Sequence, residues 1–247
     1  MDCRPEELLI AAIAARLDGL GHVAVGAASP IPGAAALLAR ARGGGQPRVS
    51  ILGSVTQNPF TDGGRELFDC AAQGRIDAFF LGGVQIDGAA NINLVGVGGY
   101  PRSKARFPGS FGSAYLYHLV PRVILFREEH SPRTLVPKVE FVSAAGTSPP
   151  NHYRPGGPYA LITGRCLFAF DRTSGRFRLE SLHPGQSLEG VRAQTGFDFD
   201  VAADLRATEM PDPATLALIR GPVAKAVAET YPAFAQQVFG QSKTHAA

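Results

Sequence analysis

The 247-residue chain is 45% hydrophobic and 18% charged, a composition that allows a substantial buried core and excludes intrinsic disorder. Its formal net charge of +3 comes from 24 basic and 21 acidic residues spread along the chain, which argues against nucleic-acid binding but suits an anionic ligand. Cys3, Cys70 and Cys166 lack metal-ligand spacing, and no apolar run is long enough to span a membrane. We therefore expect a cytoplasmic protein with free thiols, no metal and no membrane contact.

The first half of the sequence alternates between helical and strand patterns. Helices are expected over 5–20, 32–41 and 66–73, and strands over 22–25, 49–52 and 76–81. The last of these strands is apolar almost throughout, which is typical of a parallel sheet that is covered on both faces. The alternation predicts an α/β fold with an open, mostly parallel sheet flanked by helices.

The second half adds antiparallel structure. Three apolar runs cover 159–163, 166–171 and 177–182, and a short polar turn joins the last two, so we expect a small β-hairpin. Other expected elements are strands over 123–126 and 197–201, and helices starting near 114, 187 and 211. We expect one domain over residues 1–235 and a loose polar tail over 236–247.

Two polar, glycine-rich stretches follow the central strand. The first runs from Leu81 to Asn93 and the second from Arg106 to Ala114. Amides and glycine turns after a buried strand suit a ligand crevice at the carboxyl edge of a sheet. The same residue types also dominate ordinary turns, and composition alone favours that interpretation.

Three motifs favour the ligand site. They are Gly82-Gly83-Val84-Gln85-Ile86-Asp87 with Asn91-Ile92-Asn93, then Pro108-Gly109-Ser110 with Gly112, and then Leu182-His183-Pro184-Gly185 with Thr195-Gly196-Phe197. In order and spacing they resemble the family I coenzyme A transferases, whose subunits share an open α/β fold of the transferase and isomerase type. The chain is most similar to β-type subunits of the glutaconate type, including relatives that hydrolyse ring-containing CoA thioesters in steroid breakdown.

The resemblance implies a CoA thioester as substrate, no permanently bound cofactor, and an α-type partner subunit in a hetero-oligomer. It also places a strand over residues 138–142. It also implies residues that contact the substrate, which are Gln85, Asn91, Asn93, Gly109, Ser110 and Gly112. Lys104 and Arg106 are the expected phosphate contacts, although a solvated loop explains them equally well.

One position departs from the family pattern. Transferring members carry a glutamate nucleophile just past the strand that corresponds to residues 49–52, whereas this chain has Ser54 there. The resemblance therefore implies that the catalytic glutamate lies on the partner. Ser54 would need a base within hydrogen-bond reach to act as a nucleophile, and since no histidine lies nearby in the sequence, a small turn residue is the favoured interpretation.

Other functions stay open. The chain could belong to a CoA-thioester or ring-opening hydrolase, or serve as a non-catalytic structural subunit, and a sugar-phosphate isomerase is the least favoured alternative. His183 is expected to pack in a turn, and the Arg127–His130 run to form a charged strand exit rather than a metal site, because neighbouring residues of a strand face opposite sides.

Overall fold

The computed structural model describes residues 2–240, which fall into two compact units. The first unit comprises the chain up to Thr61, Ile76–Ala78 and the chain from Glu209 onward, and the second comprises Asp62–Arg75 and Phe79–Thr208. Each unit is built from separate segments of the chain. The single domain expected over residues 1–235 stays a prediction.

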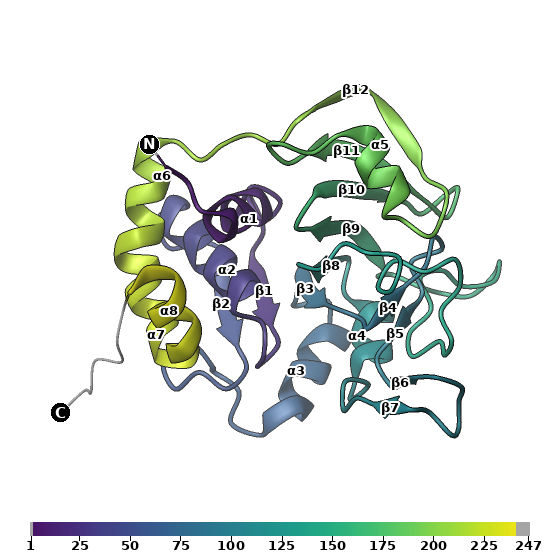
Figure 1. Ribbon diagram of the computed structural model, residues 1–247. Coiled ribbons are helices and arrows are strands. Elements are labelled where there is room, and N and C mark those ends of the chain that lie inside the picture. Colours follow the sequence, from purple (N-terminus) through teal and green to yellow (C-terminus); the bar gives the residue numbers. More distant parts are fainter. Residues whose placement is uncertain (1, 241–247) are drawn as a thin grey trace. The chain divides into compact units, whose positions relative to one another are not determined.

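The first unit packs helices against a parallel strand pair (Figure 1). Val23 of one strand pairs with Val49 of the other, and Val23 also pairs with Ala78. Apolar residues such as Ile10, Leu38 and Ile51 are almost fully buried. The elements are α1 (Pro5–Ala14), β1 (His22–Val25), α2 (Pro30–Arg42), β2 (Arg48–Ile51), α6 (Pro213–Leu218), the π-helical turn η1 (Ile219–Val223), α7 (Ala224–Thr230) and α8 (Pro232–Phe239).

The two ends of the chain differ from the predictions. The first helix ends at Ala14 rather than at residue 20, and the residues after it form turns that keep Leu17 buried. Residues 236–239 were expected in a loose tail, but they form the last part of α8, where Ala235 and Val238 are buried. Residues 241–247 of that tail lie outside the described residues.

The second unit contains a six-strand run in the order β12-β11-β10-β9-β8-β3, together with two small hairpins, β4 with β5 and β6 with β7. The elements are α3 (Gly63–Ala72), β3 (Ala78–Leu81, which starts in the first unit), β4 (Gln85–Ile86), β5 (Ile92–Asn93), β6 (Gly96–Val97), β7 (Ala105–Arg106), α4 (Ser113–Leu119), β8 (Arg122–Arg127), β9 (Pro158–Thr163), β10 (Cys166–Asp171), β11 (Arg176–Leu182), α5 (Leu188–Ala193) and β12 (Asp200–Ala207).

Strand pairing confirms the predicted fold class. The pairs β1–β2, β1–β3, β8–β9 and β11–β12 are parallel, whereas β10 pairs antiparallel with both β9 and β11. The β10–β11 hairpin is the predicted antiparallel addition, and its Phe177, Leu179 and Ser181 share the buried face as the alternation indicates. The sheet is therefore mostly parallel and flanked by helices.

The strand predicted over residues 138–142 is wrong. This segment has no ladder partner, because its backbone bonds to side chains instead. The Val139 amide donates to Asp87 Oδ2 at 3.4 Å, and the Glu140 amide donates to Gln85 Oε1 at 3.0 Å. None of the helices within residues 2–240 is long and apolar enough to cross a membrane.

Candidate functional site

The chain leaves β3 through a glycine pair that lets two backbones approach closely. A Cβ atom at Gly82 would lie 2.9 Å from the carbonyl oxygen of Phe126, and one at Gly83 would lie 2.6 Å from that of Gln85. Real Cβ atoms do not come this close, so only glycine fits here. The pair turns the chain from β3 into the β4–β5 hairpin, which carries the predicted amides.

Gln85 and Asn93 are buried and bonded to each other. Asn93 Nδ2 donates to Gln85 Oε1 and to the Gly96 carbonyl, both at 2.8 Å, while its Oδ1 accepts from the Val95 and Gly96 amides at 3.0 and 3.3 Å. Gln85 Nε2 donates to Glu140 Oε1 at 3.0 Å. The two amide side chains therefore stabilise the hairpin, and both N–H donors of Asn93 are used within it.

Glu140 joins this hairpin to the next loop. Its Oε2 accepts from the Gly98 and Gly99 amides at 2.6 and 3.0 Å. These backbone N–H groups and the Gln85 amide, with help from the Lys104 charge, lower the pKa of the exposed Glu140 carboxyl. The carboxylate is thus held in its ionised form at the base of the β6–β7 loop.

Asn91 is likewise engaged within the fold. Asp87 Oδ1 accepts from its backbone amide at 3.0 Å and Asp87 Oδ2 from its Nδ2 at 3.1 Å, while Asn91 Oδ1 accepts from the Gly146 amide at 3.1 Å. Tyr117 OH donates to the Ala90 carbonyl at 2.8 Å, and burial raises the pKa of this phenol. The predicted amides are therefore brought together, but as a scaffold around the tight turn at Ala90.

The second predicted stretch is exposed. Gly109 and Ser110 are solvent-accessible, and Gly112, at φ +65°, directly precedes α4. A Cβ atom on Gly112 would lie 2.2 Å from the Phe68 ring, so its glycine is required by packing. The Phe68 ring packs at a tilt against Phe111, with 5.6 Å between the ring centroids, and Phe111 is 81% exposed. The Gly109 amide donates to the Leu94 carbonyl at 3.3 Å, so this turn is anchored to the chain after β5 while it presents an aromatic surface to solvent.

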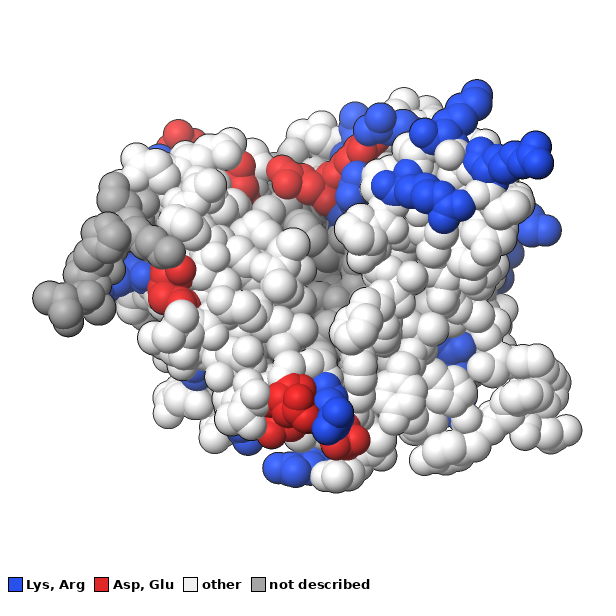
Figure 2. All heavy atoms as spheres, turned by 90° about the horizontal axis from the view of Figure 1, so that it is seen from below, with Lys and Arg blue, Asp and Glu red and all other residues white. Residues whose placement is uncertain are grey.

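Lys104 and Arg106 lie on or beside β7, and both are exposed. The Arg106 guanidinium donates to the Pro101 carbonyl, which closes the loop between β6 and β7. On the face in Figure 2, lysine and arginine side chains gather at the upper right, whereas elsewhere they mix with aspartate and glutamate. Both predicted phosphate contacts are exposed, and Arg106 is also bonded within its own loop.

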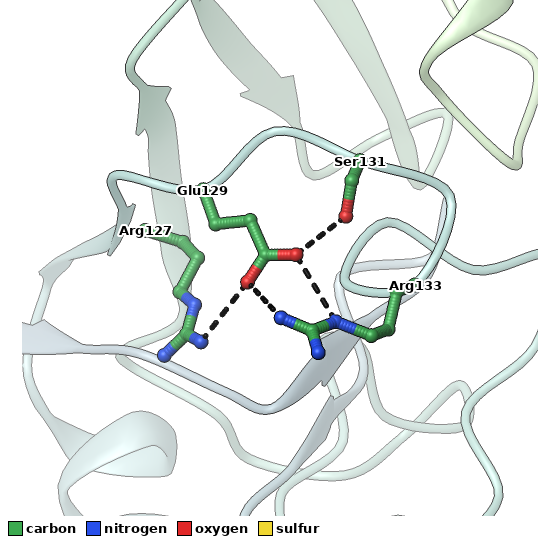
Figure 3. Close-up of polar contacts among 4 residues, drawn as sticks. All are labelled: Arg127, Glu129, Ser131 and Arg133. Carbon is green, nitrogen blue, oxygen red and sulfur yellow. Dashed lines mark hydrogen bonds and ion pairs between the residues drawn. The ribbon is translucent and has the colours of Figure 1, made fainter.

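The charged exit of β8 is an ion-pair cluster, as expected. Glu129 accepts from Ser131 Oγ at 2.7 Å and from two nitrogens of Arg133 at 2.9 and 3.2 Å, and Arg127 lies 3.5 Å away (Figure 3). The bonds from Arg133 and Ser131 lower the Glu129 pKa to about 2. Within residues 2–240, no group of three His, Cys, Asp or Glu side chains could hold a metal ion.

Two buried histidines form a network that the sequence did not reveal. His130 contacts Thr163 Oγ1 at 2.8 Å and Thr195 Oγ1 at 3.0 Å, and burial lowers its pKa to about 4. His183 contacts Thr208 Oγ1 at 2.8 Å and the Thr163 carbonyl at 2.9 Å, and burial lowers its pKa as well. Both imidazoles are therefore neutral at pH 7, and they pack rather than react.

Ser54 has a partner that local sequence could not indicate. It follows β2 after Gly53, whose φ is +87°, and its Oγ donates to Glu229 Oε2 at 2.6 Å. The Val55 amide donates to Glu229 Oε1 at 2.7 Å. Glu229 belongs to α7 and follows Ser54 by 175 residues, so no spacing motif could have joined the two.

Comparison with known proteins tests the resemblance. Residues 7–194 match the model of the protein family described as coenzyme A transferase. The chain belongs to the coenzyme A transferase family. This confirms the family on which the sequence interpretation rests, and the amide hairpin, the exposed turn and Ser54 all lie within the matched residues.

Two relatives of this chain are named for different activities, one a transferase and the other a hydrolase. The chain is 34% identical over 161 residues to one of the subunits of 3-oxoadipate CoA-transferase from Pseudomonas knackmussii, and the match covers 63% of this chain and 62% of the relative. It is 28% identical over 173 residues to the IpdB subunit of the cholesterol ring-cleaving hydrolase from Rhodococcus jostii, with the same coverage. The match thus spans somewhat less than two thirds of each relative.

Solved structures extend the similarity over nearly the whole chain. The decarboxylase AibA/AibB is 28% identical, with a TM-score of 0.75 over 92% of this chain and 99% of that one. Glutaconate coenzyme A-transferase from Acidaminococcus fermentans has a TM-score of 0.80 over 97% and 98% of the two chains, and at 23% identity this likeness concerns the fold.

Proposed function

We propose that this chain is the β-type subunit of a two-subunit enzyme that acts on acyl-CoA thioesters. The observation that carries the proposal is the family match over residues 7–194, together with the exposed turn around Gly109 and Ser110. The 3-oxoadipate CoA-transferase relative is itself named as one subunit of its enzyme, and this naming and the pairing in AibA/AibB support an α-type partner.

The proposed contacts fall into two groups. Gln85, Asn91 and Asn93 bond within the fold and support the hairpin, whereas exposure of Gly109, Ser110, Lys104 and Arg106 supports a role in meeting the substrate. Lysine and arginine are the usual partners of phosphate groups, so the last two would contact the CoA phosphates. Gly112 lets the turn pass close to Phe68.

Transfer and hydrolysis differ in the intermediate that they require. Because position 54 is a serine, a glutamyl-CoA intermediate would have to be carried by the partner. The similarity to the IpdB subunit favours hydrolysis as the second candidate. The two are distinguished by exchange of labelled CoA between acyl groups, which needs a covalent CoA intermediate, whereas hydrolysis does not.

The proposal is tested by producing the chain together with an α-type subunit and supplying a panel of acyl-CoA thioesters. We expect the complex to exchange or release CoA, and either chain alone to do neither. A non-catalytic structural role predicts instead that changes at Lys104 and Arg106 leave the KM for acyl-CoA unchanged. A complex that leaves every thioester intact would refute the proposed activity.

A further inference from the structure

The Ser54–Glu229 pair has the geometry of a nucleophile and its base. A serine hydroxyl becomes a nucleophile when a proton acceptor lies within hydrogen-bond reach and is itself held in place. Glu229 Oε2 is 2.6 Å from Ser54 Oγ, and the Val55 amide holds the other carboxylate oxygen at 2.7 Å. The Thr230 hydroxyl also donates to Oε2 at 2.6 Å, so the carboxylate is oriented from three sides.

The pair also lies where ligands bind in this kind of fold. β1 and β2 are parallel, and Ser54 follows the carboxyl end of β2. Ligands of open α/β sheets bind outside the carboxyl ends of the strands. Ser54 itself is 5% exposed, but the next residue, Val55, is 88% exposed, so the hydroxyl sits just beneath an open turn.

We propose that Ser54 is an acyl-accepting nucleophile and that Glu229 is its general base. This inference rests on the proposed function, since it takes the acyl-CoA thioester as the substrate of the same enzyme. It places the attack on this chain rather than on a partner's glutamate, and it favours hydrolysis through an ester intermediate over a glutamyl-CoA intermediate.

The reaction proceeds in two balanced halves. Ser54 Oγ bonds to the thioester carbonyl carbon while its proton passes to Glu229, the carbon–sulfur bond breaks, and the CoA thiolate leaves with that proton as the thiol. A water molecule then gives its proton to Glu229 and bonds to the ester carbonyl. The free acid leaves, and the Ser54 oxygen recovers the proton from Glu229. Base catalysis of this kind contributes about 100-fold or more to the rate.

A purely structural role for Glu229 makes a different prediction. The segment after α7 is anchored at a second point, where Tyr231 OH donates to the Gly26 carbonyl at 3.1 Å and the ring packs against Gly33. If Glu229 only fixes this segment, Glu229→Gln and Tyr231→Phe should behave alike. If Glu229 is the base, only the first substitution should change the reactivity of Ser54.

The first experiment uses a fluorophosphonate, which reacts with activated serines by losing fluoride. The complex is incubated with the probe and the labelled peptide is found by mass spectrometry. We expect one phosphonyl group on Ser54, none there in Ser54→Ala, labelling slowed about 100-fold in Glu229→Gln, and unchanged labelling in Tyr231→Phe. An unlabelled Ser54, or a Glu229→Gln complex labelled at the wild-type rate, overturns the proposal.

The second experiment separates this inference from the proposed function. The complex is mixed with acyl-CoA, quenched in acid and searched for an acyl ester on Ser54. An acyl or CoA adduct on a glutamate of either chain overturns the serine mechanism while the thioester activity stands. If no thioester reacts, but Glu229-dependent fluorophosphonate labelling of Ser54 persists, the proposed substrate fails and the nucleophile–base pair stands.

Discussion

Acidification should destabilise the chain through His130, whose two ring nitrogens contact threonine hydroxyls in a buried site. Its pKa in the folded chain is about 4, against an ordinary value of 6.5. Between these two values the unfolded state binds more protons than the folded state. The contribution of neutral His130 to the free energy of unfolding is therefore full at pH 7 and is lost as the pH falls from 6.5 toward 4. At pH 5 the loss amounts to about 2 kcal/mol. His183 adds to it in the same direction.

The assay is urea denaturation of the purified chain at pH 7.5 and pH 5.0, for the wild type and for His130→Gln. Glutamine retains hydrogen bonding but does not titrate, so the variant should lose less stability on acidification than the wild type, by about 2 kcal/mol. A variant whose free energy of unfolding falls with pH as steeply as that of the wild type would refute the assignment of this loss to His130.

Three further predictions concern single substitutions. Asn93→Ala should lower the free energy of unfolding, measured with urea, by about 3 kcal/mol, because the Gly96 carbonyl and the Val95 and Gly96 amides lose their partner. A loss below about 1 kcal/mol would show that the network is dispensable. Gly112→Ala should lower the free energy of unfolding by about 2 kcal/mol more than Gly63→Ala in the same assay. Both positions have positive φ, but only at Gly112 would a Cβ atom meet Phe68. Equal losses would contradict this packing argument. Lys104→Ala should raise the KM for acyl-CoA about 3-fold at low salt with kcat unchanged, and an unchanged KM would remove Lys104 from the CoA contacts.

Local patterns predicted the elements whose partners are close in sequence. The β10–β11 hairpin follows from two alternating segments and one polar turn. Ser187 caps α5 by accepting from the Gly190 amide at 3.0 Å, as its place before the helix indicates. In each case the information lies within a short stretch of the chain.

Distant pairings set the limits of the sequence analysis. The strand over 138–142 was expected from the family resemblance, but side chains near the β4–β5 hairpin accept its backbone N–H groups instead. Gln85 and Asn93 looked like ligand donors, yet they bond to each other across the hairpin. Nothing near Ser54 pointed to Glu229, because their contact depends on how the chain after residue 209 folds back within the first unit.

The most direct test of the central claim measures the release of free CoA thiol from acyl-CoA with a chromogenic thiol reagent. The chain and an α-type subunit are purified separately and then mixed. The account predicts that thiol appears only after mixing and that its rate saturates as one chain is titrated into the other. Thiol release by the isolated chain at the rate of the mixture, or no release by the mixture with any acyl group, would contradict it.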